Sequence, residues 1–200
     1  MTGAVIPAEP PEHPQHLRPP GGRVVAIDLQ ERLLPAIHLG DAVAARAALL
    51  LRGAAALGVE VRASEQAPDK LGATVDEVAA ALAGAGAAPV AKTKFGAAAA
   101  LRLTEAVSDD RHQMVLCGVE THVCVTQTAL ELLSAGYQVS VCADACGSRS
   151  RQDHEVALDR LRGEGVVVTT VESVLFEWCG DAAGPHFKAV SRLVKAAGPA

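Results

Sequence analysis

Aromatic residues are scarce in this sequence. They make up 2% of its 200 residues, although 50% of the chain is hydrophobic, and the apolar residues are mostly Ala, Val and Leu. A core built from small aliphatic side chains lets helices approach a sheet closely. A chain of this length and composition can bury one sizeable core, so we expect one folded domain.

The cysteines do not follow a recognisable spacing. There are five of them, an odd number without regular intervals, which argues against a disulfide framework and against paired metal ligands. Unpaired cysteines are typical of a reducing compartment. We therefore expect a cytoplasmic protein.

Membrane and export signals are also missing. No stretch reaches the roughly 18 consecutive apolar residues of a membrane-spanning helix. The first 22 residues lack both the basic start and the uninterrupted apolar run of an ordinary signal peptide, and they contain many of the prolines. We predict a flexible tail at 1–22, leaning toward polyproline II, and the folded domain at 23–200.

The chain has no excess of positive charge. Its 18 Lys and Arg residues face 23 Asp and Glu residues, which gives a formal net charge of -5 at pH 7. A protein without a basic field does not attract a polyphosphate backbone or an anionic membrane. We expect a small-molecule substrate, neutral or cationic, and neither nucleic acid nor a membrane as partner.

Short β-branched runs alternate with longer segments in which Ala and Leu recur at helical spacing. We predict strands at 24–28, 59–63, 89–91, 114–118, 139–143 and 166–170, and helices at 42–57, 74–82, 123–135, 152–162, 171–179 and 187–195. This alternation is typical of βαβ units with right-handed crossovers. The expected fold class is α/β, a three-layer sandwich around a six-stranded, mostly parallel sheet.

Three polar residues stand at or just beyond the carboxyl ends of predicted strands. They are Asp28 after VVAI, Lys92 after PVA, and Cys124 in the loop GVETHVC. Ligands of such sheets bind at this edge. Cys124 also begins a predicted helix, where free N–H groups and a nearby ammonium favour a thiolate, and a neighbouring acid could accept the thiol proton.

Four stretches of sequence together form a specific pattern: VVAIDLQERLLPAI, SEQAPDKLGATVDEV, AKTKFGA and GVETHVCVTQTALELLSAGYQVSVCADACGSRS. In them the chain resembles the isochorismatase-like, or cysteine hydrolase, superfamily from residue 23 to about 195. The SEQ-P-LG-TV and VETHVCV stretches are most similar to the isochorismatase domain-containing proteins. The resemblance implies the strand order 3-2-1-4-5-6 and assembly into a homo-oligomer, either a dimer or a tetramer.

The resemblance also implies a catalytic triad. By motif it falls on Asp28, on Lys92 as the lysine of the KTxF segment, and on Cys124. Lys94 is the alternative lysine, but it stands two residues deeper in the loop, whereas Lys92 directly follows the strand. The family carries a cis peptide in the GVE turn, here before Glu120, so that the backbone N–H groups of Glu120 and Cys124 would form an oxyanion hole.

The expected chemistry is acyl transfer through a Cys124 thioester. Isochorismatases proper cleave a vinyl ether and typically lack this cysteine, so its presence favours an amide, carbamoyl or related acyl substrate. Phe95, Thr121 and His122 are candidates for the substrate pocket. Gly96 departs from relatives that carry Ser after the Phe of the KTxF segment, and the pocket wall near Phe95 is therefore expected to differ.

We expect neither a metal nor another cofactor. Nicotinamidases of the superfamily bind a divalent ion through an Asp and histidines near the second strand. The corresponding stretch here, RASEQAPDK, contains no histidine, and Glu65 alone would be a poor site because transition metals need several converging ligands. This departure also weakens the case for a nicotinamidase.

Three other classes compete with a hydrolase. A non-catalytic or regulatory member of the same fold would bind a small molecule without turnover. A nucleotide-binding domain would need a GxGxxG turn after the first strand, where this chain has DLQERLLPAI. A redox enzyme would be expected to carry a CxxC pair, and the chain offers only Cys142 and Cys146, four residues apart.

The remaining polar and cysteine residues favour structural interpretations. Cys117, Cys142 and Cys146 fall within or just after buried strands, and Cys179 falls in an apolar helix. The polar residues after the fifth strand, Asp144 and 148–150, are expected to cap the helix that follows.

Overall fold

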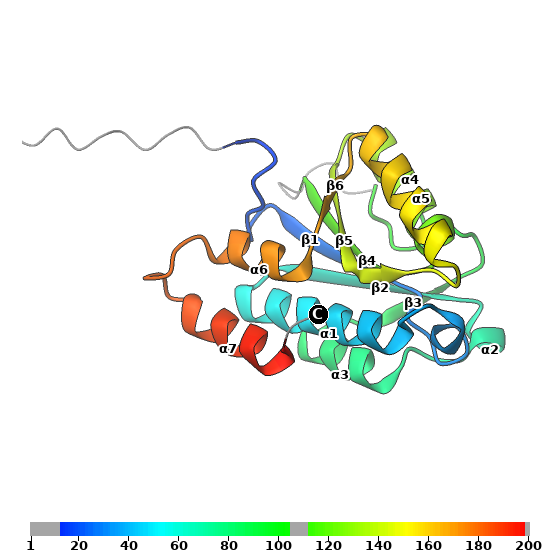
Figure 1. The fold of residues 1–200 in the computed structure, drawn as a ribbon, viewed down its shortest axis with the longest axis horizontal. Helices are drawn as coiled ribbons and strands as arrows, with labels where there is room; N and C mark the ends of the chain where they lie inside the picture. Colours follow the sequence, from blue (N-terminus) through cyan, green and yellow to red (C-terminus); the bar gives the residue numbers. More distant parts are fainter. Residues whose placement is uncertain (1–12, 105–111, 199–200) are drawn as a thin grey trace, which may run out of the picture.

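The structure is a computed structural model that describes residues 13–104 and 112–198. Within them, one parallel sheet has the order β3-β2-β1-β4-β5-β6 (Figure 1). Its strands are β1 (Gly22–Ile27), β2 (Glu60–Gln66), β3 (Pro89–Lys92), β4 (Gln113–Val119), β5 (Gln138–Gly147) and β6 (Val167–Thr169). The predicted fold class and strand order are confirmed.

Helices cover both faces of this sheet, as Figure 1 shows. They are α1 (Gly40–Leu57), α2 (Pro68–Leu71), α3 (Asp76–Gly84), α4 (Thr126–Ser134), α5 (Arg151–Gly163), α6 (Val171–Cys179) and α7 (Phe187–Ala197). Helices α1, α3, α6 and α7 pack on one face, and α4 and α5 pack on the other. Two shorter helical turns precede α1 and α4, at Leu34–Ala36 and Thr121–Val125.

The strands send alternate side chains to the two faces, which gives two buried clusters. In β1, Val24 and Ala26 belong to the cluster under α1, whereas Val25 and Ile27 belong to the cluster under α4 and α5. Small residues allow close packing, as expected from the composition. A Cβ atom on Gly53 of α1 would lie 2.2 Å from Cδ2 of Leu175 in α6, so these helices touch backbone to side chain.

Several boundaries differ from the sequence prediction, and one difference matters for the site. The predicted helix at 123–135 is divided: a π-helical turn at Thr121–Val125 carries Cys124, and α4 begins at Thr126. β5 runs on to Gly147, beyond the predicted end at residue 143, because its last residues pair with β4 again after a register shift. α2 was not expected.

The described end of the leading segment is held against the domain. Leu17 is buried, and its N–H donates to Oε2 of Glu177 at 3.0 Å. The N–H of Arg18 donates to Oε1 of Gln113 at 2.9 Å, and β1 begins at Gly22. Residues 1–12 of the predicted tail at 1–22 lie outside the described residues.

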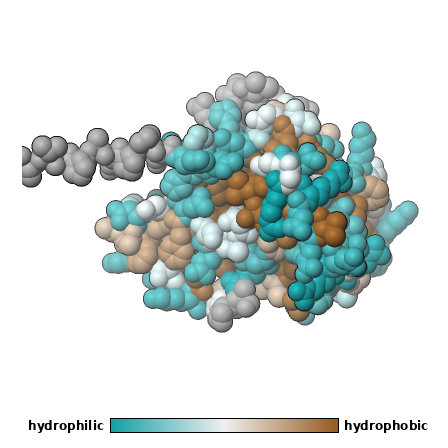
Figure 2. All heavy atoms as spheres, turned by 45° about the horizontal axis from the view of Figure 1, so that its top comes forward, coloured by the Kyte–Doolittle hydropathy of each residue, from teal (hydrophilic) through white to brown (hydrophobic). Residues whose placement is uncertain are grey.

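Apolar and hydrophilic side chains both reach the surface. Figure 2 shows a face on which apolar residues form a patch bordered by hydrophilic ones. The large apolar side chains that are exposed include Leu39, Val90, Phe95, Val156 and Phe176. Among the helices in the described part of the chain, none is long and apolar enough to cross a membrane.

Candidate active site

The three predicted catalytic residues meet at the carboxyl edge of the sheet. Asp28 directly follows β1, Lys92 is the last residue of β3, and Cys124 lies in the turn between β4 and α4. All three are buried. Asp28 and Lys92 both lie close enough to the Cys124 thiol to shift its pKa.

Asp28 and Lys92 form a buried ion pair. Nζ of Lys92 lies 2.7 Å from Oδ2 of Asp28, and their side chains are 1% and 0% exposed, respectively. The ammonium also donates to Oε1 of Gln66 at 2.7 Å and to the carbonyl oxygens of Lys94 (3.2 Å) and Phe95 (3.0 Å). A buried ion pair is tolerated only when such extra hydrogen bonds satisfy it. Lys92 is therefore the lysine that faces the acid, and Lys94 contributes only its carbonyl.

The backbone at Asp28 adopts an uncommon conformation. Its φ is 55°, in the left-handed region that non-glycine residues seldom occupy. Its N–H donates to the carbonyl of Ser64 at 3.0 Å, and its carbonyl accepts the N–H of Gln30 at 2.9 Å. Such conformations persist only where the surrounding structure enforces them, and they are frequent at functional sites.

The thiol of Cys124 is not a resting thiolate. Burial, followed by the Asp28 carboxylate, raises the pKa of Cys124 to about 12, and Lys92 only partly opposes them. The expected effect of the ammonium has the right direction, since Lys92 lowers the pKa of Cys124. Desolvation outweighs it because burial disfavours the charged form directly.

Glu120 carries the expected cis peptide, between Val119 and Glu120. Its carboxylate Oε2 accepts the backbone N–H of Arg149 at 2.9 Å and Nε of Arg149 at 3.1 Å. Its carbonyl accepts the N–H groups of Val123 and Val125, at 3.1 and 3.2 Å. The side chain of Glu120 is thus occupied by Arg149, and only its backbone is available to a reacting group.

The next two residues of the loop point toward the start of α5. Oγ1 of Thr121 lies 2.9 Å from Nδ1 of His154, and Nδ1 of His122 lies 2.9 Å from Oγ of Ser148. Residues 120–122 are therefore each held by one side chain from the segment 148–154. These partners were not predicted from the sequence, and the only signal for them is the polar run SRS directly after β5.

Phe95 and Gly96 lie in the loop that wraps Lys92. The side chain of Phe95 is 52% exposed. A Cβ atom on Gly96 would lie 2.0 Å from Oε1 of Glu131. Because Oε2 of Glu131 accepts the N–H of Ala98 at 3.1 Å, this carboxylate fills the space that a side chain at position 96 would need. A glycine at position 96 therefore leaves the room that the Glu131 carboxylate occupies.

Thr128 of α4 ties this loop to the nucleophile. Its Oγ1 accepts the N–H of Ala97 at 3.0 Å and donates to the carbonyl of Cys124 at 2.7 Å. One buried hydroxyl therefore bridges the loop after β3 and the turn after β4. The bridge connects the loop that follows Lys92 with the backbone of Cys124.

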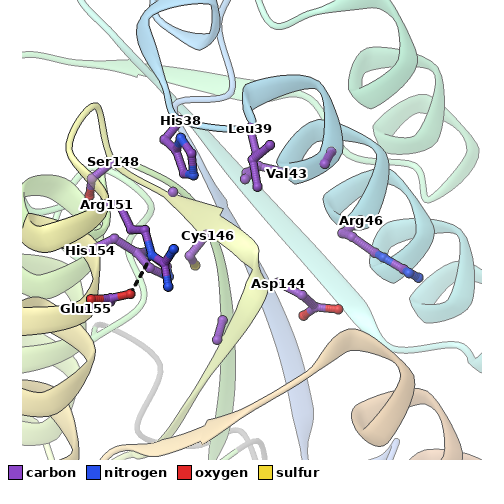
Figure 3. Close-up of a pocket in the computed structure, with 13 residues that line it drawn as sticks. His38, Leu39, Val43, Arg46, Asp144, Cys146, Ser148, Arg151, His154 and Glu155 are labelled. Atoms are coloured by element: carbon purple, nitrogen blue, oxygen red, sulfur yellow. Dashed lines mark hydrogen bonds and ion pairs between the residues drawn. The ribbon is translucent and has the colours of Figure 1, made fainter. Parts of the chain in front are cut away.

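A cavity of about 340 Å³ lies beside the residues that hold the nucleophile loop, and Ser148 and His154 belong to its lining (Figure 3). It opens between the start of α1, the end of β5 and the first turn of α5, and its lining includes Asp144, Ser148, Arg151 and His154. Asp28, Lys92 and Cys124 do not line it. The cavity meets the candidate active site only through Ser148 and His154, the partners of residues 121 and 122.

The capping predictions after β5 are correct in part. Oγ of Ser150 accepts the N–H of Asp153 at 3.3 Å and caps α5 as expected. Asp144 instead accepts the N–H of Val171 at 2.9 Å and so caps α6. Ser148 is buried and bonds to His122, so it does not cap α5.

The remaining cysteines are not paired. Cys117, Cys142 and Cys146 are buried free thiols, and Cys179 is half-buried. Burial raises the pKa of Cys117 to about 12 and the pKa values of Cys142 and Cys146 well above their ordinary value. These properties are typical of structural cysteines.

Glu65, considered above as a metal ligand, has a different partner. Its Oε1 accepts both the N–H and the Oγ1 hydroxyl of Thr74, each at 2.7 Å. In residues 13–104 and 112–198, no group of three or more His, Cys, Asp or Glu side chains is arranged to hold a metal ion.

Known proteins share both the sequence pattern and this fold. The family profile described as "Isochorismatase domain" matches residues 23–173. Isochorismatase domain-containing protein 1 of Salmo salar is 44% identical over 178 residues, which cover 86% of this chain. The match spans 60% of the salmon protein's own length.

Solved structures agree. The structure named MAR1 ribonuclease from Caenorhabditis elegans superposes with a TM-score of 0.86 at 30% identity, covering 92% of this chain and 95% of its own. A protein from Escherichia coli, described as an octameric hydrolase of unknown specificity, has the same fold. Its TM-score is 0.75 at 24% identity, and the match covers 90% of this chain and 95% of that one. The chain belongs to the isochorismatase family.

Proposed function

We propose that this protein is a metal-independent cysteine hydrolase that acts on a small amide, carbamoyl or related acyl substrate through a thioester at Cys124. One observation carries the proposal: the buried Cys124 lies beside the buried Asp28–Lys92 ion pair, near enough for both charges to shift the pKa of its thiol. A nucleophile beside a base that is itself oriented by a third group is the arrangement that covalent catalysis needs. The family is consistent with hydrolysis, which is also the activity in the E. coli protein's description.

The first half-reaction forms the thioester. Asp28 takes the thiol proton as the sulfur of Cys124 attacks the substrate carbonyl carbon. The N–H groups of Glu120 and Cys124 stabilise the oxyanion that develops. When the C–N bond breaks, the leaving amine takes the proton from Asp28. Phe95, Thr121 and His122 remain candidates for contact with the substrate, although the side chains of residues 121 and 122 also hold the loop.

The second half-reaction releases the acid. Asp28 removes a proton from water, the hydroxide attacks the thioester carbonyl, and the C–S bond breaks. The departing sulfur regains its proton from Asp28, which restores the starting state. Lys92 keeps the charge of the Asp28 carboxylate balanced throughout. Because the pKa of Cys124 is about 12 at rest, proton removal must accompany attack rather than precede it.

A substrate screen tests this proposal. Small amides, ureido acids and esters are assayed for release of ammonia or acid, with Cys124→Ala as the blank. We expect Cys124→Ala to lose at least about 10³-fold in turnover of any substrate found. Turnover at the wild-type rate in that variant would overturn the scheme. RNA is included because the C. elegans neighbour is named a ribonuclease, although the net charge of -5 argues against it.

A non-catalytic, small-molecule-binding member of the same fold is the second candidate. The raised pKa of Cys124 favours it, because a protonated thiol is unreactive. Turnover beside binding separates the two functions. A hydrolase should release ammonia or acid from a small amide that it binds and lose this release in Cys124→Ala, whereas a binding protein should bind the amide without releasing product.

The assembly and location of the protein are further parts of the proposal. We expect a homo-oligomer, either a dimer or a tetramer, and the octameric E. coli neighbour supports assembly of this fold. Light scattering after size exclusion measures this directly, and a monomer at micromolar concentration would contradict it. The five free cysteines favour the cytoplasm.

A further inference from the structure

Strand β2 lies between the two strands that carry the ion pair. Side chains alternate along a strand, so Ser64 and Gln66 face one side of the sheet and Glu65 faces the other. In the parallel ladders, Ser64 is paired with Ile27, the residue before Asp28, and Gln66 is paired with Lys92. The register alone therefore sets one polar side chain of β2 beside each member of the ion pair.

Ser64 fixes the carboxylate. Its Oγ donates to Oδ1 of Asp28 at 2.8 Å, and Ser64 is buried. Lys92 binds the other oxygen, Oδ2, at 2.7 Å. With a partner on each oxygen, the carboxylate cannot rotate without breaking a hydrogen bond in a site that water does not reach.

Gln66 fixes the ammonium. Its Oε1 accepts from Nζ of Lys92 at 2.7 Å, and its Nε2 donates to the carbonyl of Thr93 at 2.8 Å. That second bond sets which end of the amide faces the lysine, because the Thr93 carbonyl can only accept.

Gln30 holds Gln66 in turn. The N–H of Gln66 donates to Oε1 of Gln30 at 2.8 Å, and its carbonyl accepts from Nε2 of Gln30 at 3.1 Å. Gln30 is fully buried and also donates to the carbonyl of Gly72 at 2.7 Å. Each polar group of Gln66 thus has a partner, which leaves its side chain little freedom.

We infer that Ser64 and Gln66 are positioning residues, which hold Asp28 and Lys92 in the orientation that makes the Cys124 thiol reactive. The inference rests on the proposed function. A neutral amide suits this role better than a carboxylate, because a second negative charge beside Lys92 would further disfavour the thiolate of Cys124. The one carboxylate in this part of β2, Glu65, lies on the opposite face and bonds to Thr74.

Site-resolved alkylation provides the test. The rate of iodoacetamide labelling of Cys124 is measured by mass spectrometry from pH 7 to pH 10 in the full chain. Gln66→Glu keeps the shape and adds a negative charge, so we expect labelling at a given pH to slow by about tenfold or more. Gln66→Met removes the acceptor without adding charge, and we expect a smaller slowing with the same dependence on pH.

Arg62→Gln is the matched control. Like Gln66→Glu, it makes the net charge more negative by one, and it does so on the same strand. Arg62 is exposed and lies about 13 Å from Gln66, at about 3.3 Å per residue along the strand. We expect it to label like the wild type. For Ser64, Ser64→Ala should lower the kcat of any substrate found without raising KM, and Ser64→Thr should restore it because the hydroxyl returns. Circular dichroism and thermal unfolding verify the fold of each variant.

The outcomes separate this inference from the proposed function. Wild-type labelling in both Gln66 variants would overturn the inference, and so would an equal slowing in Arg62→Gln, which would indicate only long-range charge. Loss of turnover in Cys124→Ala combined with wild-type behaviour at Gln66 would overturn this inference alone. Turnover that survives Cys124→Ala would overturn both.

Discussion

The candidate active site has two halves that are built in different ways. The ion-pair half consists of Asp28, Lys92 and their β2 partners, which strand register holds together. Asp28, Lys92 and Ser64 are buried, and Gln66 is half-buried. The loop half consists of residues 120–122, and each of its side chains is held by one residue from the segment 148–154. The side chain of one of those partners, Arg149, is 65% exposed. Burial lowers the pKa of another, His154.

This difference indicates a division of labour. Charges that must stay balanced in a dry site need several fixed hydrogen bonds, because an unpaired buried charge is costly. A loop that presents a nucleophile and backbone donors needs only a fixed orientation. One contact for each of its side chains is enough to hold that orientation. We therefore expect the ion-pair half to be sensitive to substitution and the loop half to be tolerant.

The largest effect is expected from breaking the ion pair. Lys92→Met leaves Asp28 buried without its cation, which should lower the free energy of unfolding by about 3–5 kcal/mol. Urea denaturation measures this loss. The double variant Asp28→Asn, Lys92→Met should recover much of it, since neither charge then remains buried alone.

Arg149→Met is the comparison from the loop half. It also removes a cation from a carboxylate, that of Glu120, but the Arg149 side chain is largely exposed and its backbone N–H still donates to Oε2. The loss should stay within about 1 kcal/mol. Equal losses in Lys92→Met and Arg149→Met would contradict the proposed difference between the halves.

An intermediate effect is expected at Gly96, where the loop after β3 meets α4. Gly96→Ser forces the Glu131 carboxylate aside and breaks its bond to the N–H of Ala98, which should cost about 1–2 kcal/mol. The same change in a Glu131→Ala background should be nearly neutral. Gly84→Ser is the control, because nothing lies within 4 Å of a Cβ atom there, and urea denaturation compares the variants.

Asp28 and Lys92 could be predicted from the sequence because each stands at a strand end, whereas their β2 partners Ser64 and Gln66 were not predicted. Asp28 and Lys92 close short β-branched runs, and the carboxyl ends of parallel strands share one edge. The choice of Lys92 over Lys94 followed from the same rule. The predicted strand order was confirmed, although β5 and the turn before α4 differ in their bounds.

The partners of the loop half and the state of the thiol could not be predicted in this way. Ser148 and His154 lie 26 and 33 residues from their partners, and no periodic pattern connects them. The fit of Gly96 to Glu131 likewise depends on a contact between distant segments. The pKa of Cys124 is set first by burial, which a helix start and a nearby lysine do not reveal.

The smallest effect is expected from pH in the loop half. Burial lowers the pKa of His154 below its usual value, so the unfolded chain binds a proton that the folded chain resists. This contribution to stability is fully present above the unfolded pKa of about 6.5 and is lost as the pH falls through it. Because His154 is only half-buried, the loss between pH 7.5 and pH 5.5 should stay below about 1 kcal/mol. His154→Gln should reduce that loss, measured by urea denaturation at the two pH values, whereas an unchanged pH dependence would contradict the lowered pKa of His154.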